Sequence, residues 1–259
     1  MKPAPFDLAR PANLADAIAA MAQGDADTRV LAGGQSLGPM LNLRVAHPKR
    51  LVQVNHLPEL AHVAEAVDAI MLGACVTHAA IAAGRTPDIA GGVLARVAGG
   101  IAYQAVRNRG TIGGSLCHAD PAADWVTVLT ALDAEVVLQS ASGVRRIAAA
   151  AFVTGAFVTA LVPGEILTAL RIPHPPLGAG WGYVKACRKP GEFAHAMSAA
   201  LVAGPTRRLV IGATGSRPLL LTGSDAGSDG AHAALAGLDP VDRQMQLAVV
   251  RRALAAAGG

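Results

Sequence analysis

The sequence predicts an α+β protein made of two small α/β subdomains followed by a domain with a small antiparallel sheet and helices. Helix-like and strand-like patterns alternate through the first two thirds of the chain. Residues 173–176 (Pro-His-Pro-Pro) can continue neither a helix nor a central strand, so they mark a boundary. Strand-like runs dominate after it. The predicted units are residues 1–55, 56–173 and 174–259.

In the first unit, Asn13 is expected to cap a helix over 14–21. A strand over 28–32 ends at a Gly-Gly pair, and a short helix then leads to a strand over 51–54. A helical crossover between two strands indicates that they run parallel.

The other two units are predicted from apolar runs and helical periodicity. In the middle unit we expect strands over 70–72, 135–138 and 166–172, and helices over 77–83, 87–98 and 122–132. In the last unit we expect antiparallel strands over 181–187, 199–203 and 209–213, a loop over 222–230 and a helix over 241–257.

The composition excludes several classes of protein. The 259 residues are 52% hydrophobic and 15% charged, which is the opposite of the balance that keeps a chain disordered. Three scattered cysteines form neither a disulfide framework nor a four-cysteine metal site. Aromatic residues, at 3%, are too few for a base-stacking nucleic-acid surface.

No membrane span or secretion signal is expected. The uncharged stretch 147–164 consists mainly of Ala, Thr and Gly, which contribute little transfer free energy. The N-terminus lacks the apolar core of a signal peptide. We therefore expect a cytoplasmic protein with reduced thiols.

The net charge of +4 lies entirely in the last third of the chain. Residues 1–180 hold equal numbers of basic and acidic side chains, whereas residues 181–259 hold nine basic and five acidic ones. Nothing in the first part indicates nucleic-acid binding. A contact surface for a partner subunit and an ordinary solvated surface explain the excess equally well.

Two glycine-containing segments are candidates for binding phosphate. Residues 31–36 (Leu-Ala-Gly-Gly-Gln-Ser) follow a strand, and their successive amides can point into one concavity that accepts phosphate oxygens. Residues 107–124 contain a second Gly-Gly pair with Thr111, Ser115 and Asp124, which suggests a second loop on a pyrophosphate. The alternatives are a tight strand-to-helix turn for the first segment and a structural glycine-rich loop for the second.

Other cofactor and metal signatures are missing from the sequence. It contains no G-x-G-x-x-G and no G-x-x-x-x-G-K-[ST] segment, so neither a Rossmann site nor a P-loop is indicated. It contains no C-x-x-C or H-E-x-x-H segment either, so no metal site is expected.

These segments resemble the FAD-binding medium subunit of molybdenum hydroxylases, the family that includes carbon monoxide dehydrogenase and xanthine dehydrogenase. Order and spacing match over residues 3–215. The matching stretches are 32–36 with 43–44, 107–115 with 118–124, 163–167 with 171–173, and 183–185 with Arg188, Phe193 and Ala194. The resemblance implies two subdomains that clasp FAD, which is the fold of the PCMH-type FAD-binding domain. Family members usually have a longer C-terminal domain, so residues 174–259 are expected to be shortened.

The resemblance also implies a set of cofactor-binding residues and no catalytic side chain. Ala32, Gly33, Gly34, Gln35 and Ser36 would hold the pyrophosphate from one side, and Thr111, Gly113, Gly114 and Ser115 from the other. Asp124 would bind the ribose or adenine, Ile101 and Phe193 would flank the isoalloxazine, and Lys185 would approach that ring. His118 is either near the cofactor or a polar residue at a helix entry.

The family relation implies an electron relay. This chain would carry FAD alone, while the molybdenum cofactor and the [2Fe-2S] clusters would belong to a large and a small partner subunit. Electrons would leave through FAD to NAD, a quinone or oxygen. The alternatives are a stand-alone FAD-dependent oxidoreductase with its own substrate and a non-catalytic nucleotide-binding scaffold.

Overall fold

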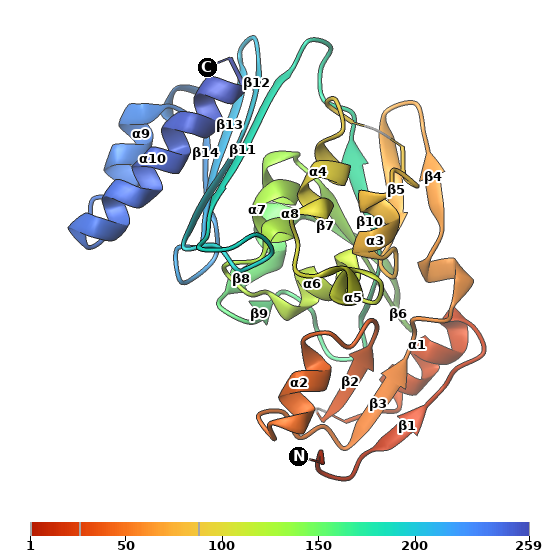
Figure 1. Cartoon of the computed structure of the whole chain (residues 1–259). Helices are drawn as coiled ribbons and strands as arrows, with labels where there is room; N and C mark the ends of the chain where they lie inside the picture. The colour runs from red at the N-terminus through yellow and green to blue at the C-terminus, as the bar shows by residue number, and fades with distance from the viewer. Residues whose placement is uncertain (1, 26, 88, 259) are drawn as a thin grey trace.

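The computed structural model describes residues 2–25, 27–87 and 89–258. Its described residues form sheets of three, five, four and two strands, with helices packed against the larger sheets. Figure 1 shows three parts, with the N-terminal part at the bottom, a central part, and the C-terminal part at the upper left. The two chain ends lie at opposite ends of the molecule.

The N-terminal part is a parallel three-stranded sheet in the order β1-β3-β2. Its elements are β1 (Asp7–Ala9), α1 (Leu14–Ala22), β2 (Thr28–Leu31), α2 (Leu37–Asn42) and β3 (Arg50–Gln53). The predicted helix cap is confirmed, since Asn13 Oδ1 accepts a hydrogen bond from the Asp16 amide at 2.9 Å. β1 was not predicted, because three largely exposed residues show no alternation of apolar and polar side chains.

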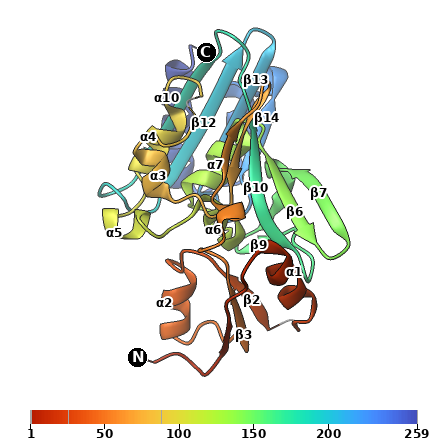
Figure 2. The same ribbon diagram turned by 90° about the vertical axis from the view of Figure 1, so that its right-hand side faces the viewer.

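The central part is an antiparallel five-stranded sheet in the order β4-β5-β10-β6-β7. Figure 2 shows its helices gathered on one side of the sheet, where they form the largest apolar core. The strands are β4 (Val63–Glu65), β5 (Ala69–Gly73), β6 (Glu135–Ser140), β7 (Gly143–Ala148) and β10 (Ile166–Pro173), with the small pair β8 (Val153–Gly155) and β9 (Val158–Thr159). The helices are α3 (His78–Ala82), α4 (Val93–Gly99), α5 (Gln104–Arg107), α6 (Ile112–His118), α7 (Asp124–Ala131) and α8 (Ala149–Phe152).

Two expected elements differ from the structure. The helix expected over 87–98 begins only at Val93, because Gly91 and Gly92 have φ of +70° and +83°, which a right-handed helix does not allow. Position 88 of that prediction lies outside the described residues. The loop expected over 222–230 contains a 3₁₀ turn, and helix α9 (Ser228–Ala234) begins within it.

The C-terminal part is an antiparallel sheet with a helix on each face. Its strands run in the order β11-β12-β13-β14, with β11 (Gly180–Ala186), β12 (Ala196–Ala203), β13 (Thr206–Gly212) and β14 (Leu219–Thr222). Helix α10 (Pro240–Ala256) lies so close to β11 that a Cβ on Gly182 would be 1.9 Å from the Ala253 oxygen. Helix α7 of the central part covers the other face, where Ala131 packs with Ala199 and Val210.

The contact with α7 fixes the C-terminal sheet on the central part. Arg208 of β13 donates hydrogen bonds to the carbonyl oxygens of Thr130 and Ala131 at the end of α7, which supplies partners that a helix C-terminus lacks. The limits of the three predicted domains, and the shortening of the last one, stay predictions. Among the described residues no helix is both long and apolar enough to cross a membrane.

Candidate functional site

The two glycine segments lie against each other although more than 70 residues separate them. A Cβ on Gly33 would be 2.0 Å from the backbone oxygen of Arg109, and a Cβ on Gly114 would be 3.9 Å from the Cβ of Ala32. Only glycine allows the first approach, because the nearest atoms belong to backbone and cannot rotate away. The apposition expected from the sequence is therefore present in the structure.

A cavity of about 270 Å³ lies at this junction. It is lined by Gly33, Asn55, Cys75, Thr77, Asn108, Arg109 and Thr111. Pockets for drug-sized ligands measure roughly 300–1,000 Å³, so this cavity can hold only part of a dinucleotide. Five of its lining residues carry a hydroxyl or amide side chain or the charge of an arginine, which suits a polar and anionic group.

The first glycine segment presents free backbone donors. Among the described residues, nothing accepts a hydrogen bond from the amides of Gly33, Gly34, Gln35 or Ser36. Gly34 has φ of +71°, and the side chain of Gln35 donates to the Gly33 oxygen at 3.0 Å, which holds the turn. Consecutive unpaired amides in such a turn form a site for anionic oxygens.

The second glycine segment is a helix start and not the loop we expected. Thr111 caps α6 by accepting a hydrogen bond from the Gly114 amide at 3.1 Å. The Gly113 amide donates to the Ala74 oxygen at 3.0 Å, and the Ser115 amide donates to the Thr111 oxygen. Because these amides are already paired, the donors that this segment offers are the hydroxyl groups of Thr111 and Ser115.

Gly113 and Gly114 therefore serve packing more than ligand contact. A Cβ on Gly113 would lie 2.6 Å from the Cβ of Ala74, and one on Gly114 would lie 2.8 Å from Thr111 Oγ1. The glycines let the segment fit between the strand end at Ala74 and the first glycine segment.

Asp124 and Lys185 form a buried ion pair. Lys185 Nζ lies 3.1 Å from both carboxylate oxygens of Asp124, and their side chains are 11% and 6% exposed. The hydroxyl of Tyr183 donates to Asp124 Oδ1 at 2.7 Å. Burial, together with the Asp124 charge, holds the pKa of Tyr183 well above its usual value, so it stays a donor.

Asp124 and Lys185 were expected at different ends of FAD, Asp124 at the ribose or adenine and Lys185 near the isoalloxazine. In this structure the two side chains contact each other. Their pairing joins α7 to β11, and their roles toward the cofactor stay predictions.

The remaining expected residues lie in two places. Ile101 forms a parallel β-bridge with Gly191, two residues before Phe193, so these two expected ring neighbours come together. His118 lies at the far end of α6 from Thr111, about 10 Å away along a helix that rises 1.5 Å per residue. Its ring packs 5.2 Å from that of Phe157, and it is not among the residues that line the cavity.

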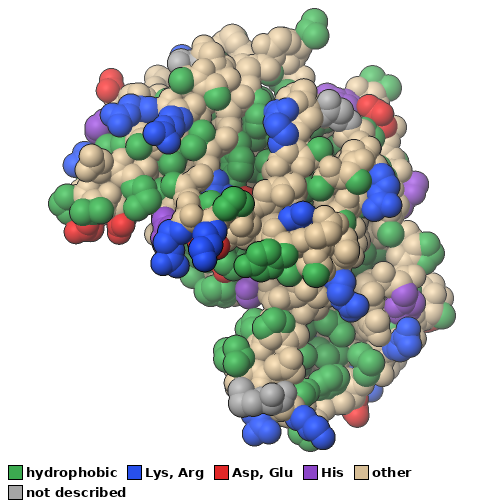
Figure 3. Space-filling view, viewed as in Figure 1, with side chains coloured by type: hydrophobic (Ala, Val, Ile, Leu, Met, Phe, Trp, Pro, Cys, Tyr) green, Lys and Arg blue, Asp and Glu red, His purple; other side chains and the backbone are tan. Residues whose placement is uncertain are grey.

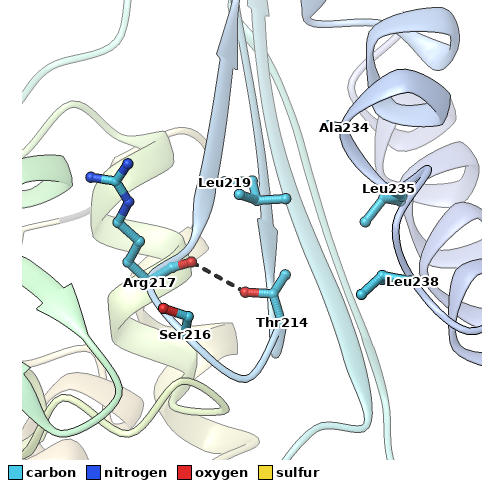
Figure 4. Close-up of a pocket in the computed structure, with 7 residues that line it drawn as sticks. All are labelled: Thr214, Ser216, Arg217, Leu219, Ala234, Leu235 and Leu238. Carbon is cyan, nitrogen blue, oxygen red and sulfur yellow. Dashed lines mark hydrogen bonds between the residues drawn. The ribbon is translucent and has the colours of Figure 1, made fainter.

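A second hollow of about 250 Å³ lies in the C-terminal part, between the β13–β14 connection and α9. Figure 4 shows Leu235 and Leu238 facing Leu219 across it. At its rim the Thr214 hydroxyl donates a hydrogen bond to the Arg217 carbonyl oxygen. Its walls are mostly apolar and it has no contact with the glycine segments, so it is not part of the candidate site.

Comparison with known proteins decides the family. The sequence profile described as "FAD binding domain in molybdopterin dehydrogenase" matches residues 4–175. The chain belongs to this family of FAD-binding domains. The whole chain also superimposes on one subunit of carbon monoxide dehydrogenase from Hydrogenophaga pseudoflava, with a TM-score of 0.91 and 31% identity over 100% of this chain and 99% of that one. The quinoline 2-oxidoreductase of Pseudomonas putida 86 gives a TM-score of 0.87 at 32% identity, over 100% of this chain and 99% of that one.

Curated relatives agree with this assignment. The chain is 36% identical to the 6-hydroxypseudooxynicotine dehydrogenase complex subunit alpha of Paenarthrobacter nicotinovorans, over 93% of this chain and 87% of the relative. It is 38% identical to the carbon monoxide dehydrogenase medium chain of Afipia carboxidovorans, over 78% and 70% of the two chains. Each relative is named as one chain of a dehydrogenase, so the expected fold, oxidoreductase class and FAD-binding family are confirmed.

The FAD-binding domain contains cavity residues that sequence reasoning did not select. Asn55 lies two residues beyond the end of β3, and Cys75 and Thr77 lie just beyond the end of β5. Polar residues just beyond strand ends were a usable signal, because such ends converge at ligand sites in α/β folds. Burial raises the pKa of the Cys75 thiol to about 12, so this cysteine is a neutral wall residue and not a nucleophile.

His78, behind the cavity wall, predicts a pH dependence of stability. The Trp125 indole donates to His78 Nδ1 at 3.2 Å, and burial together with the Arg107 charge lowers the pKa of His78 from 6.5 to about 4. Between those pH values the unfolded chain binds more protons than the folded one, so the free energy of unfolding falls as the pH drops. The loss is at most about 3 kcal/mol by pH 4.

Urea unfolding from pH 7.5 down to pH 4.5 measures this contribution. The variant His78→Gln should flatten the pH profile relative to the wild type, whereas His232→Gln, which removes an exposed histidine, should leave the profile unchanged. Parallel profiles for the wild type and His78→Gln would show that His78 is protonated equally in both states.

Proposed function

We propose that this chain holds FAD across the two glycine segments and serves as the FAD-carrying subunit of a molybdenum hydroxylase. The proposal depends mainly on the four unpaired amides of residues 33–36, a segment that begins beside a cavity lined by both Gly33 and Thr111. The pyrophosphate of FAD is an anion with several acceptor oxygens, and unpaired amides and hydroxyls are the donors it needs.

The residues present fit this cofactor. A side chain on Gly33 would fill the junction, and the cavity is too small for more than the phosphate part of the ligand. The amides of Gly33, Gly34, Gln35 and Ser36 and the hydroxyl groups of Thr111 and Ser115 would hold the phosphates, while Ile101 and Phe193 would lie beside the ring. When bound, FAD supplies the redox chemistry, and the protein supplies position and polarity around it.

The partner assignment rests on the relatives. They are named as a medium chain or as a subunit of a dehydrogenase complex. We infer that this chain works with a small [2Fe-2S] subunit and a large subunit that carries the molybdenum cofactor, and that FAD delivers electrons to an external acceptor. No group of three or more metal-ligating side chains occurs among the described residues.

The proposed location of the chain is the cytoplasm. The three cysteines are all free, which supports a reducing compartment and hence the cytoplasm. On the face in Figure 3, basic side chains are scattered over all three parts, so the excess charge of residues 181–259 fits a solvated surface as well as a partner contact.

Reconstitution tests the cofactor. The full chain, freed of any flavin and titrated with FAD, should bind one equivalent, become yellow, and be bleached and recoloured by dithionite and air. A folded chain that does not bind FAD would overturn the proposal. Binding of ADP as tightly as FAD, without a bound flavin spectrum, would support the nucleotide scaffold instead.

A second experiment separates the complex subunit from a stand-alone enzyme. The FAD-loaded chain alone should not turn over any substrate that its holo complex oxidises. Co-purification of a tagged chain with an iron–sulfur subunit and a molybdenum subunit is the expected result in the native host. Steady turnover by the isolated chain would favour the stand-alone oxidoreductase.

A further inference from the structure

Arg107 is hydrogen-bonded to the segment directly before it in the chain, residues 101–104, at the edge of the candidate site. Its Nη1 donates to the carbonyl oxygens of Ile101 at 2.9 Å and Ala102 at 2.7 Å, and its Nη2 donates to Gln104 Oε1 at 3.0 Å. Its Nε is buried without a hydrogen-bond partner among the described residues. A half-buried guanidinium whose N–H groups donate to backbone oxygens fixes the path of that backbone.

The backbone that Arg107 holds is strained. Ala102 has φ of +45°, a left-handed conformation that costs a non-glycine residue roughly 1 kcal/mol. Its amide donates to the Gly191 oxygen at 3.1 Å, and a Cβ on Gly191 would lie 2.8 Å from the Ala102 oxygen. Strain of this kind persists only where surrounding contacts enforce it, and it concentrates at ligand sites.

The same bridge presents two exposed aromatic side chains. Ile101 and Gly191 pair in parallel, and Tyr103 and Phe193 each follow the bridge by two residues. Tyr103 is 74% exposed and Phe193 is 60% exposed. The chain has only eight aromatic residues, and of the described ones a single other, Phe157, is exposed to a comparable degree.

We propose that Arg107 is a positioning residue for the ring end of the flavin site and that Tyr103 contacts the flavin ring. This inference rests on the proposed function. The hydrogen bonds of Arg107 set the turn at residues 101–103 against the loop that carries Phe193, so that two aromatic faces flank a planar heteroaromatic ring. Arg107 is directly followed by Asn108 and Arg109, which line the phosphate cavity, so one short segment connects both ends of the site.

Comparison of FAD with ADP isolates the ring end. The flavin-free full chain is titrated with FAD by fluorescence quenching, and ADP is measured by competition. The ratio of Kd(ADP) to Kd(FAD) reports what the ring and the ribityl chain add to binding. Tyr103→Ala and Arg107→Met should each lower this ratio about ten-fold and leave Kd(ADP) within about two-fold of the wild type, since an aromatic contact is worth up to about one decade.

Matched variants control for indirect effects. Tyr103→Phe keeps the aromatic face and should retain the wild-type ratio, and Arg107→Lys should fall between the wild type and Arg107→Met because it can reach one carbonyl oxygen. Arg146→Met removes an exposed arginine from β7, far along the chain from both segments, and should change neither constant. Tyr103 is exposed, so the Tyr103 pair decides the matter even where Arg107→Met fails to fold.

Three results would overturn the inference. They are an unchanged ratio in Tyr103→Ala, equal weakening of FAD and ADP in Arg107→Met, and a wild-type ratio close to one. If the wild type and Tyr103→Ala bind FAD equally tightly, this inference alone is overturned. A wild-type chain that binds neither ligand would instead reject the proposed function.

Discussion

Replacing Gly33 with valine should weaken FAD binding by at least about 100-fold, which corresponds to the loss of two charge-assisted hydrogen bonds of roughly 1.5–3 kcal/mol each. A Cβ at this position would lie 2.0 Å from the Arg109 oxygen and 2.7 Å from the Arg109 carbonyl carbon. Backbone cannot rotate away, so the two glycine segments must separate and the donors of Gly33–Ser36 move off the opposite wall. Flavin titration of the folded variant measures the effect.

Gly38→Ala is the matched control for this prediction. Gly38 lies five residues further on, within α2, with nothing inside 4 Å of the position of a Cβ. Alanine should be accepted there and should leave the Kd of FAD unchanged, because it also suits a helix. Because the amides that donate to phosphate are displaced, Gly33→Val should weaken the binding of ADP as much as the binding of FAD. Full FAD affinity in Gly33→Val would reject the apposed glycine segments as the cofactor site.

Local sequence patterns predicted the parts of the fold that depend on neighbouring residues. Asn13 indicates a helix start because its side chain reaches an amide three residues away, and this bond is present. The glycines at 33 and 114 indicate close approach of backbone, since glycine is the residue that lacks a Cβ. The apposition of the two segments followed from their chemistry and their resemblance to a family, and the structure brings them together.

Features that depend on distant residues were not predictable from local patterns. The amides of the second glycine segment are paired with Ala74 and with Thr111, and nothing near residues 111–115 signals a partner almost 40 residues upstream. The segment alone therefore does not show that its amides are already paired. The same limit applies to Asp124 and Lys185, which are 61 residues apart and meet only because α7 packs on the sheet that contains β11.

The two glycine segments offer different hydrogen-bond donors to a ligand. Both segments were expected to hold the pyrophosphate, one from each side. The structure leaves the amides free in the first segment, while the second has only its hydroxyl groups available. Substitution of Ser36 or Gly34 should therefore act on phosphate binding directly, whereas substitution of Gly113 should act through packing against Ala74.

Replacing Lys185 with methionine should lower the free energy of unfolding of the flavin-free chain by about 3–5 kcal/mol, the usual cost of breaking a buried ion pair. Lys185 Nζ lies 3.1 Å from both oxygens of Asp124. Methionine fills a similar volume but leaves the buried carboxylate with only the Tyr183 hydroxyl as a partner. Urea unfolding at pH 7.5 measures the loss.

Two variants show whether the missing charge is the cause. Arg188→Met breaks an exposed pair with Glu192, with side chains 80% and 34% exposed, and should cost less than about 1 kcal/mol. The double variant Lys185→Met with Asp124→Leu removes both charges and should recover most of the lost stability, since an apolar pair of similar volume replaces a buried ion pair at little cost. If Lys185→Met were no more harmful than Arg188→Met, the pair would not be what fixes the C-terminal sheet to α7, and Lys185 would be free to act on the cofactor instead.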